Sequence, residues 1–400
     1  MSRLVPPSAR LGNRLSRRSF LTLGSVAALA ACGDLGLPAI GTGPGPGADA
    51  SRGVTVALLL PSGASDEGLR ALASNLENAA RMALADLSGL EIDLRVHDTQ
   101  GRPDRAAEVA RQAVSEGAGI ILGPVLAPEA SAVGAAVASD GINVLSFSNN
   151  TEVAGGNVFV MGMTFDNTAQ RLLAYAAGQD RGQVLIVAED NVRGRLGTSA
   201  IQRAATGTGA TVVGTQTYAF SQAGVTQAVP AIARAARSTG AQSIFFTDDT
   251  SGALPVLAQL LPDNRVAHPQ FQFMGLTRWD IPEAALQLRG LQNGWFALPD
   301  PGMTRRFEAR YREAHGQAPH PIAGLAYDGM AAIGALLSTG RADPLSRAAL
   351  TQGSGFAGVN GIFRLLPDGT NRRGLAIATI RDEAVVILDP APRRFAGAGS

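Results

Sequence analysis

Small polar residues stand where several apolar runs of this sequence end, and their types could hold a charged ligand. In the first half of the chain the residues at these positions are Ser62, Gly123, Pro124, Ser146, Ser148 and Asn149. In the second half they are Asp190, Asn191, Asp248 and Asp249. Hydroxyls and backbone amides of the first group could take a carboxylate, and carboxylates of the second group could take an ammonium. The pattern predicts a site for an amino acid or a peptide, with N-capping of the following helices as the alternative role of each residue.

Catalytic patterns are weaker in this sequence than binding patterns. The four histidines are His97, His268, His315 and His320, and none lies in a His-Glu-x-x-His zinc motif. The sequence has no Gly-x-Ser-x-Gly elbow, and all 34 of its basic residues are arginines, which excludes P-loop and Schiff-base chemistry. Sequence spacing does not place two carboxylates opposite each other as glycosidases require. We therefore expect a binding protein that is not an enzyme and that uses no cofactor and no metal.

Cys32 is the only cysteine of the 400 residues, and it closes the run Leu29-Ala30-Ala31-Cys32. An arginine-rich start and a short apolar stretch precede this run, which is the layout of an export signal. The run resembles the lipobox of bacterial lipoproteins, whose cysteine is acylated and becomes the mature N-terminus. Residues 16–22 also resemble the twin-arginine export motif. We expect an export signal over 1–31 and lipidation at Cys32, which would anchor the protein to a membrane of the bacterial cell envelope, facing the periplasm. Which membrane it would be is left open.

The segment 32–53 is rich in glycine and proline from Pro38 onward and is expected to be a flexible tether. Beyond the five arginines of the export signal, the chain carries 29 arginines against 33 acidic residues, a net charge of −4. It has no basic stripe with interleaved aromatic residues, so nucleic acid is not an expected partner.

The elements that would position these residues alternate regularly after the tether. Val54–Leu60 is a continuous apolar run, typical of a buried parallel strand, and residues 69–87 then repeat apolar side chains at helical spacing. Further strands are predicted at 92–96, 119–122, 142–145, 158–161, 183–188, 211–218, 243–247 and 270–274. Helical patterns separate most of these strands, which predicts βαβ units and parallel sheets.

The last third of the chain departs from this alternation. Long helices are predicted at 303–315 and 322–337, and a short β segment at 361–365, 375–381 and 384–388. Asp382 and Glu383 are expected to form the turn between the last two strands. Tyr327 and Asp328 lie within the second helix and are expected to form a structural hydrogen-bonded pair that holds the lobes together, with ligand contact as the alternative.

Several of these motifs carry a family resemblance. Val56–Gly63, His97–Gly101, Ile120–Pro124 and Ile142–Asn149 resemble the Leu/Ile/Val-type periplasmic binding proteins. Asn293–Ala297, Ala323–Gly329 and Gly355–Arg364 resemble the penicillin-binding-protein activator lipoproteins, a branch of that superfamily. The loop Pro124–Pro128 is apolar, whereas receptors for branched amino acids usually have hydroxyl-bearing residues there, so this loop departs from the usual pattern.

The resemblance implies an α/β chain with the two-lobed type I periplasmic-binding-protein fold, in which each lobe is a parallel sheet flanked by helices and a cleft lies between the lobes. We expect lobe 1 at 54–157 plus about 299–345. Lobe 2 is expected at 158–298 plus about 346–395.

Two functions follow from the resemblance. The first is a penicillin-binding-protein activator that regulates peptidoglycan synthesis by docking on a peptidoglycan synthase. The alternative is a solute receptor that captures an amino acid or peptide and presents it to the permease of an ABC-type transporter. The motifs of the last third and the apolar 124–128 loop favour the activator, and the polar strand ends favour the receptor.

Overall fold

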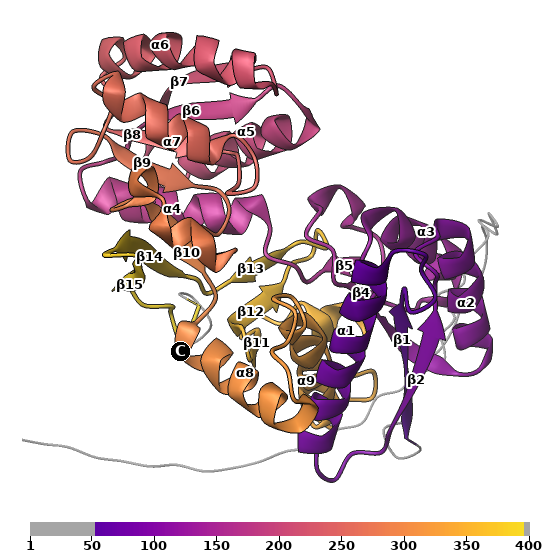
Figure 1. The fold of residues 1–400 in the computed structure, drawn as a ribbon. Coiled ribbons are helices and arrows are strands. Elements are labelled where there is room, and N and C mark those ends of the chain that lie inside the picture. The colour runs from indigo at the N-terminus through magenta and orange to yellow at the C-terminus, as the bar shows by residue number, and fades with distance from the viewer. Residues whose placement is uncertain (1–52, 396–400) are drawn as a thin grey trace, which may run out of the picture. The chain divides into compact units, whose positions relative to one another are not determined.

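The computed structural model describes residues 53–395, which form two principal β-sheets, each flanked by helices (Figure 1). The predicted export signal, the lipidation site Cys32 and all of the tether except Gly53 lie outside the described residues. Within 53–395, no helix combines the length and the apolar character that crossing a membrane requires.

The first sheet is entirely parallel, with the strand order β2-β1-β3-β4-β5. Its elements in chain order are β1 (Val54–Leu60), α1 (Glu67–Asp86), β2 (Ile92–Asp98), α2 (Pro103–Ser115), β3 (Ala118–Leu122), α3 (Ala127–Val137), η1 (Ala138–Asp140), β4 (Val144–Ser146), η2 (Thr151–Val153) and β5 (Val158–Val160). Alternate side chains of β1 enter two different cores, because side chains of a strand point to opposite faces of a sheet. Leu58 and Leu60 pack in the core that contains α1, whereas Ala57 and Leu59 pack against α2 and α3. This two-sided burial explains why β1 is a continuous apolar run.

The second sheet has the strand order β15-β14-β10-β9-β8-β6-β7. Its elements in chain order are α4 (Phe165–Gly178), β6 (Gln183–Glu189), α5 (Val192–Ala205), β7 (Thr211–Tyr218), α6 (Gln222–Ser238), β8 (Ser243–Phe246), α7 (Leu254–Asp263), β9 (Gln272–Gly275), η3 (Glu283–Gln287), η4 (Arg289–Leu291) and β10 (Trp295–Leu298), with β14 (Ala376–Arg381) and β15 (Ala384–Asp389) added at the end of the chain. The strands β6 to β10 are parallel, and β14 and β15 join antiparallel. Leu185 and Val187 of β6 face α6 and α7, and Val184 and Ile186 face α4 and α5.

The segment between β10 and β14 packs with the first sheet. It comprises α8 (Pro301–His315), α9 (Gly324–Leu337), α10 (Arg347–Leu350), β11 (Phe356–Gly358), β12 (Gly361–Leu365) and β13 (Asn371–Arg373). Phe307, Met330 and Phe363 of this segment lie in the same core as Leu58 of β1. The three short strands form a sheet of their own, which lies beside α8 and α9 in Figure 1.

Two expected lobe boundaries therefore differ from the observed sheets. The second lobe was expected to begin at Val158, but β5 pairs with β4 in the first sheet. The residues from about 346 were expected to join the second lobe, but only β14 and β15 do so, since Leu350, Phe356 and Phe363 pack in the core of the first sheet. We use "first lobe" for β1–β5, α1–α3 and α8–β13, and "second lobe" for α4–β10, β14 and β15.

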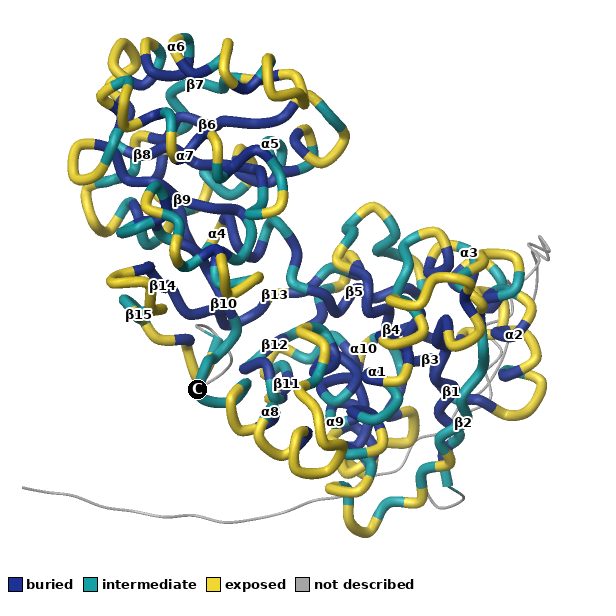
Figure 2. The backbone as a smooth tube through the Cα atoms, viewed as in Figure 1, coloured by how far each residue is buried: buried dark blue, intermediate teal, exposed yellow. Residues whose placement is uncertain are grey.

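The chain passes between the lobes in three segments. These are 161–164 between β5 and α4, 299–300 between β10 and α8, and 374–375 between β13 and β14. In Figure 2 the central strands of both sheets and the segment around β13 are buried, whereas the edge strands β2, β7 and β15 and the outward faces of the helices are partly or fully exposed. The residues that connect the lobes are therefore held within packed structure.

Candidate functional site

One pocket is lined by residues of both lobes and of two of the three connecting segments. Its volume is about 340 Å³, which lies within the range of small-molecule sites. We call it the arginine pocket, and it is lined by Val125, Phe147, Ser148, Asn149, Gly162, Met163, Arg278, Ile281, Pro299, Pro321, Ile322, Leu325, Asn360 and Arg373. Apolar side chains form most of this wall, and a few polar groups interrupt it. A small ligand with an apolar part and a polar part matches such a lining.

Arg278 enters the arginine pocket from the loop that follows β9. Its Nε and Nη2 donate to the two carboxylate oxygens of Asp280 at 2.9 and 2.5 Å, which fixes the plane of the guanidinium group. The loop is anchored by Trp279, which is fully buried and stacks on Phe296 with 6.2 Å between the ring centroids. Gly275 is required beside it, because a Cβ there would lie 2.0 Å from Trp279 Nε1. The loop therefore holds Arg278 through a buried aromatic side chain and an ion pair.

The first lobe contributes Ser148 and Asn149, which follow β4. The buried Ser148 accepts a hydrogen bond from the Asn150 amide at 3.1 Å, and its own O–H remains available to donate. Asn149 is exposed, and its side-chain amide has no hydrogen bond within residues 53–395. Ser146 is fully buried and bonds only backbone groups. Its Oγ donates to the Pro124 carbonyl at 2.9 Å and accepts from the Ser148 amide at 3.2 Å. Of these three predicted residues, Ser148 and Asn149 line the pocket and Ser146 supports the loop.

Buried amides join β13 to the first connecting segment and to α4. Asn371 of β13 donates through Nδ2 to the carbonyls of Val160 and Gly162 at 2.7 and 2.9 Å. Asn167 of α4 donates to Asn371 Oδ1 at 2.9 Å and accepts from the Arg373 amide at 2.8 Å. The strand β13 is thereby bonded to the first connecting segment and to the start of α4.

Arg373 and Asp328 form a buried ion pair that supports the pocket floor. Arg373 Nη1 lies 3.4 Å from Asp328 Oδ2, with side chains that are 2% and 0% exposed. Arg373 also donates through Nε to the Met161 carbonyl at 2.9 Å, and Asn360 donates to Asp328 at 3.0 Å. Burial raises the pKa of Asp328, while the charge of Arg373 and the bonds from Asn360 and Val359 oppose this rise. The pair ties α9, β13 and the turn between β11 and β12 together.

Tyr327 and Asp328 are adjacent in sequence but bond different partners. The Tyr327 hydroxyl donates to Asp86 of α1 at 2.5 Å, and Arg310 of α8 donates to the same carboxylate at 2.8 Å. Burial acts to raise the pKa of Asp86, but these two hydrogen bonds outweigh it and lower the pKa. Tyr327 thus bonds within the first lobe, whereas Asp328 binds Arg373, which in turn donates to the Met161 carbonyl of the first connecting segment. The two residues do not form the single pair that the sequence predicts.

The predicted acids of the second lobe follow strands β6 and β8 of its sheet, and none of them lines the arginine pocket. Asp248 follows β8, is 4% exposed and bonds the hydroxyl of Tyr218. Burial raises the pKa of Asp248 to about 6, and the negative charges of Glu189 and Asp249 act in the same direction. Asp249 is bonded to Arg193 of α5.

The remaining predicted residues serve mainly as turns and caps. The exposed Ser62 lies 3.5 Å from Asp98 through Oγ, and Asn191 caps α5 by accepting from the Gly194 amide at 2.7 Å. Asp190 is exposed and lies 3.5 Å from Arg195. Gly123 has a φ of 91°, and a Cβ there would lie 2.4 Å from the Leu59 carbonyl oxygen, so the backbone itself demands glycine. Pro124 is buried, and its carbonyl accepts hydrogen bonds from both Ser146 and the Phe147 amide.

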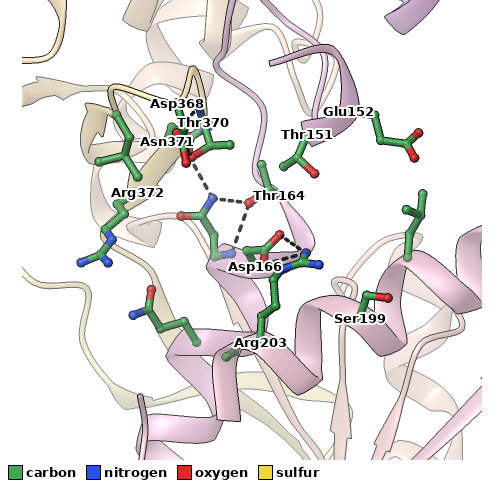
Figure 3. Close-up of a pocket in the computed structure, with 15 residues that line it drawn as sticks. Thr151, Glu152, Thr164, Asp166, Ser199, Arg203, Asp368, Thr370, Asn371 and Arg372 are labelled. Carbon is green, nitrogen blue, oxygen red and sulfur yellow. Dashed lines mark hydrogen bonds and ion pairs between the residues drawn. The ribbon is translucent and has the colours of Figure 1, made fainter. Parts of the chain in front are cut away.

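A second pocket, of about 530 Å³, lies beside α4 and α5 (Figure 3). Thr151 and Glu152 of η2 and Asp368 to Arg372 of the β12–β13 turn face Asp166 and Arg203 across it. Arg203 donates to both oxygens of Asp166 through Nε and Nη2, at 3.0 and 2.9 Å. A third pocket, of about 320 Å³, shares Thr151, Asp166 and Arg203 with this one and Asn149 with the arginine pocket. Asn149 therefore stands where the two smaller cavities meet.

The sequence reasoning missed Arg278, Arg373 and Asn360. The available signal for Arg278 was its position shortly after the predicted strand 270–274, between the polar residues Thr277 and Asp280. Arg373 and Asn360 carried no comparable signal, because they enter the pocket from short strands and turns whose packing depends on the fold of distant segments.

Comparisons with known proteins support the architecture. A Rhodospirillum rubrum protein assigned to a branched-chain amino acid ABC transporter superposes with a TM-score of 0.72 at 17% identity, covering 84% of this chain and 100% of that one. An ABC transporter substrate-binding protein from Desulfitobacterium hafniense, solved with Leu, gives a TM-score of 0.61 at 18% identity over 84% and 100% of the two chains. A solute-binding protein of an ABC transporter from R. palustris, solved with benzoate, gives 0.56 at 18% identity over 86% and 98%.

These similarities confirm the predicted fold class, which is the type I periplasmic binding fold with parallel sheets flanked by helices. No curated protein matches the sequence at a significant level. The family described as periplasmic binding protein matches residues 53–384, which is most of the chain. The chain therefore belongs to the periplasmic binding protein family.

Proposed function

We propose that this protein is an exported solute receptor that binds a small ligand in the arginine pocket and delivers it to an ABC-type transporter. The observation that carries the proposal is the lining of that pocket. Residues of both lobes and of two of the three connecting segments meet there around a largely apolar wall with a few polar groups. A ligand bound there would contact both lobes and two of the segments that join them. A ligand that makes different contacts in two arrangements of the lobes shifts the balance between those arrangements.

The similar structures support this choice over the activator role. All three are described as parts of ABC transporters, and the ligands named with two of them, Leu and benzoate, both pair a carboxylate with an apolar body. The motifs that resemble penicillin-binding-protein activators serve the fold here: Asp328 binds Arg373 and the 359–360 amides, and Tyr327 binds Asp86. Their presence therefore does not require a docking surface for a peptidoglycan synthase.

Ligand binding tests the proposal directly. The purified full chain would be melted in the presence of the twenty amino acids, short peptides, and aliphatic and aromatic carboxylates and amines. A ligand present at 100 times its Kd stabilises the native state by about 2.7 kcal/mol, which raises the Tm by several degrees. We expect at least one compound to produce this shift in the native protein.

Two variants assign the shift to the pocket. Arg278→Gln removes a charge that lines the arginine pocket and should reduce the shift. Arg81→Gln, on the exposed face of α1 where Arg81 pairs with Glu77, should leave the shift unchanged. The receptor function is rejected if no compound shifts the Tm, and a pull-down of a penicillin-binding protein by the same chain would then favour the activator.

A further inference from the structure

The arginine pocket presents positive charge and no negative charge to a ligand. Two of its lining residues are arginines, and none is an aspartate or a glutamate. Its other polar groups are the side chains of Ser148, Asn149 and Asn360, which are uncharged. The charged chemistry of the wall is therefore suited to an anion.

Arg278 is the group best placed to hold that anion. Its Nε and Nη2 are bonded to Asp280, but Nη1 has no partner within the described part of the chain, which leaves two N–H groups free. Arg373 is more heavily committed, because it donates to the Met161 carbonyl and pairs with Asp328. The Ser148 hydroxyl, on the first-lobe side of the pocket, can donate a further hydrogen bond.

The acids that could hold an ammonium group are placed elsewhere and are already bonded. Asp248 is bonded to Tyr218, and Asp249 to Arg193. Two further acids, Asp280 and Asp328, form ion pairs with the arginines of the pocket: Asp280 with Arg278, and Asp328 with Arg373. An ammonium group in the pocket would find only the neutral oxygens of Ser148, Asn149 and Asn360 and no carboxylate of the wall. A charged group removed from water without an opposite charge is disfavoured.

We infer that the ligand is a small carboxylic acid with an apolar body and no amino group, whose carboxylate is held by Arg278. This inference rests on the proposed function, since it specifies the ligand class of the same pocket. It differs from the amino acid or peptide that the polar strand ends predict. The apolar part of the ligand would lie against Phe147, Met163, Ile281, Ile322 and Leu325.

Two matched series of probes test this ligand class by calorimetry on the full chain. The first series is 4-methylvalerate, leucine and 3-methylbutylamine, which share a branched carbon skeleton. The second is 3-phenylpropionate, phenylalanine and 2-phenylethylamine. Within at least one series, we expect the simple acid to bind tenfold or more tightly than the amino acid, and we expect neither amine to bind. A tenfold difference corresponds to about 1.4 kcal/mol, which is within the range for leaving a buried polar group unpaired.

Variants show whether Arg278 is the anion-holding group. Arg278→Gln should weaken binding of the acid at least tenfold, Arg278→Lys should restore part of it, and Arg81→Gln should have no effect. Circular dichroism and the Tm of each variant establish that it is folded. Equal binding by the Arg278→Gln variant would overturn the assignment.

The outcomes separate this inference from the proposed function. If an amino acid binds as tightly as its simple acid, or if the only ligands of the wider panel carry an ammonium or lack a carboxylate, the inference is wrong and the receptor function stands. If no compound binds, the receptor function fails and the inference fails with it.

Discussion

Asp248 is a buried carboxyl group whose surroundings favour its protonated form. It lies at the end of β8 between Tyr218 of β7 and Glu189 of β6, with Asp249 beside it and Arg193 of α5 beyond. Burial and the two neighbouring acids raise its pKa to about 6. In an unfolded chain the pKa of an aspartate is about 3.9. The folded chain therefore keeps a proton on Asp248 over a pH range in which the unfolded chain has lost it.

This difference predicts how stability depends on pH. The contribution of Asp248 is complete below about pH 4 and is lost as the pH rises through about 6, because the folded state binds more protons in that window. Asp248→Asn removes the ionisable group and should remove this loss. The difference between the free energy of unfolding of the variant and that of the native chain should therefore shift in favour of the variant between pH 4 and pH 7. This shift should be about 3 kcal/mol at most. Urea unfolding at four pH values measures this, and parallel profiles for the two proteins would contradict it.

At the scale of single elements, the turn of the last hairpin needs two residues with positive φ, and its sequence supplies residues that adopt this conformation at some cost. Asp382 and Glu383 form the two-residue turn between β14 and β15, where Arg381 pairs with Ala384. Both turn residues have positive φ values, 50° and 61°, as a type I′ turn requires. Asparagine and glycine adopt this conformation at the lowest cost.

The double substitution Asp382→Asn and Glu383→Gly should therefore stabilise the hairpin. We expect the free energy of unfolding to rise by about 1 kcal/mol, because a left-handed conformation costs other residues roughly 1–2 kcal/mol each. Glu308→Gly in the interior of α8 is the matched control and should lower stability by about 1 kcal/mol. Denaturant unfolding of the three proteins checks both signs, and a loss of stability in the double variant would show that the acidic side chains themselves hold the turn.

The same hairpin illustrates what the sequence made predictable. The strands 375–381 and 384–388 and their turn were predicted, because an apolar run and a polar turn signal are local features. The strand β10 and the short strands β11 and β13 were not predicted as strands, because each is defined by its partners: β10 lies between β9 and β14, which is over seventy residues further along the chain.

The candidate site was less predictable than the fold for the same reason. Ser148 and Asn149 were predicted from their place after a strand, and both line the arginine pocket. Asp248 and Asp249 also follow a predicted strand, but they do not line the arginine pocket. A place after a strand predicts the edge of the sheet at which a residue lies, but it does not predict the position along that edge. Arg373 enters the pocket from β13, whose place depends on contacts with Val160 and Asn167.

On the scale of the whole molecule, the two lobes are coupled through buried amides as well as through the backbone. Asn167 and Asn371 are 7% and 5% exposed and bond each other at 2.9 Å. Through their other bonds they hold the Arg373 amide and the Val160 and Gly162 carbonyls. Removing either residue leaves buried groups unpaired, which costs about 1–3 kcal/mol or more.

A double-mutant cycle measures this coupling. Asn167→Ala and Asn371→Ala should each destabilise the chain, and the double variant should lose less stability than the sum by about 0.5–3 kcal/mol. Asn143→Ala with Asn371→Ala is the control cycle, because Asn143 bonds the Leu345 carbonyl at 2.8 Å and shares no partner with Asn371. The control effects should add. Additive effects in the first cycle as well would show that the amides act independently.

The chain crosses between the two lobes three times, and this determines which fragments of the protein could fold on their own. The first lobe is assembled from two stretches of sequence, and so is the second, whose last pair of strands is supplied by the end of the chain. Deleting residues 374–395 would expose one side of β10 in the middle of the second sheet, and ending the chain before residue 300 would remove α9 from its place against α1. Neither half can therefore be produced as an uninterrupted fragment, and a proteolytic nick at 299–300 would leave two pieces that each contribute to both lobes.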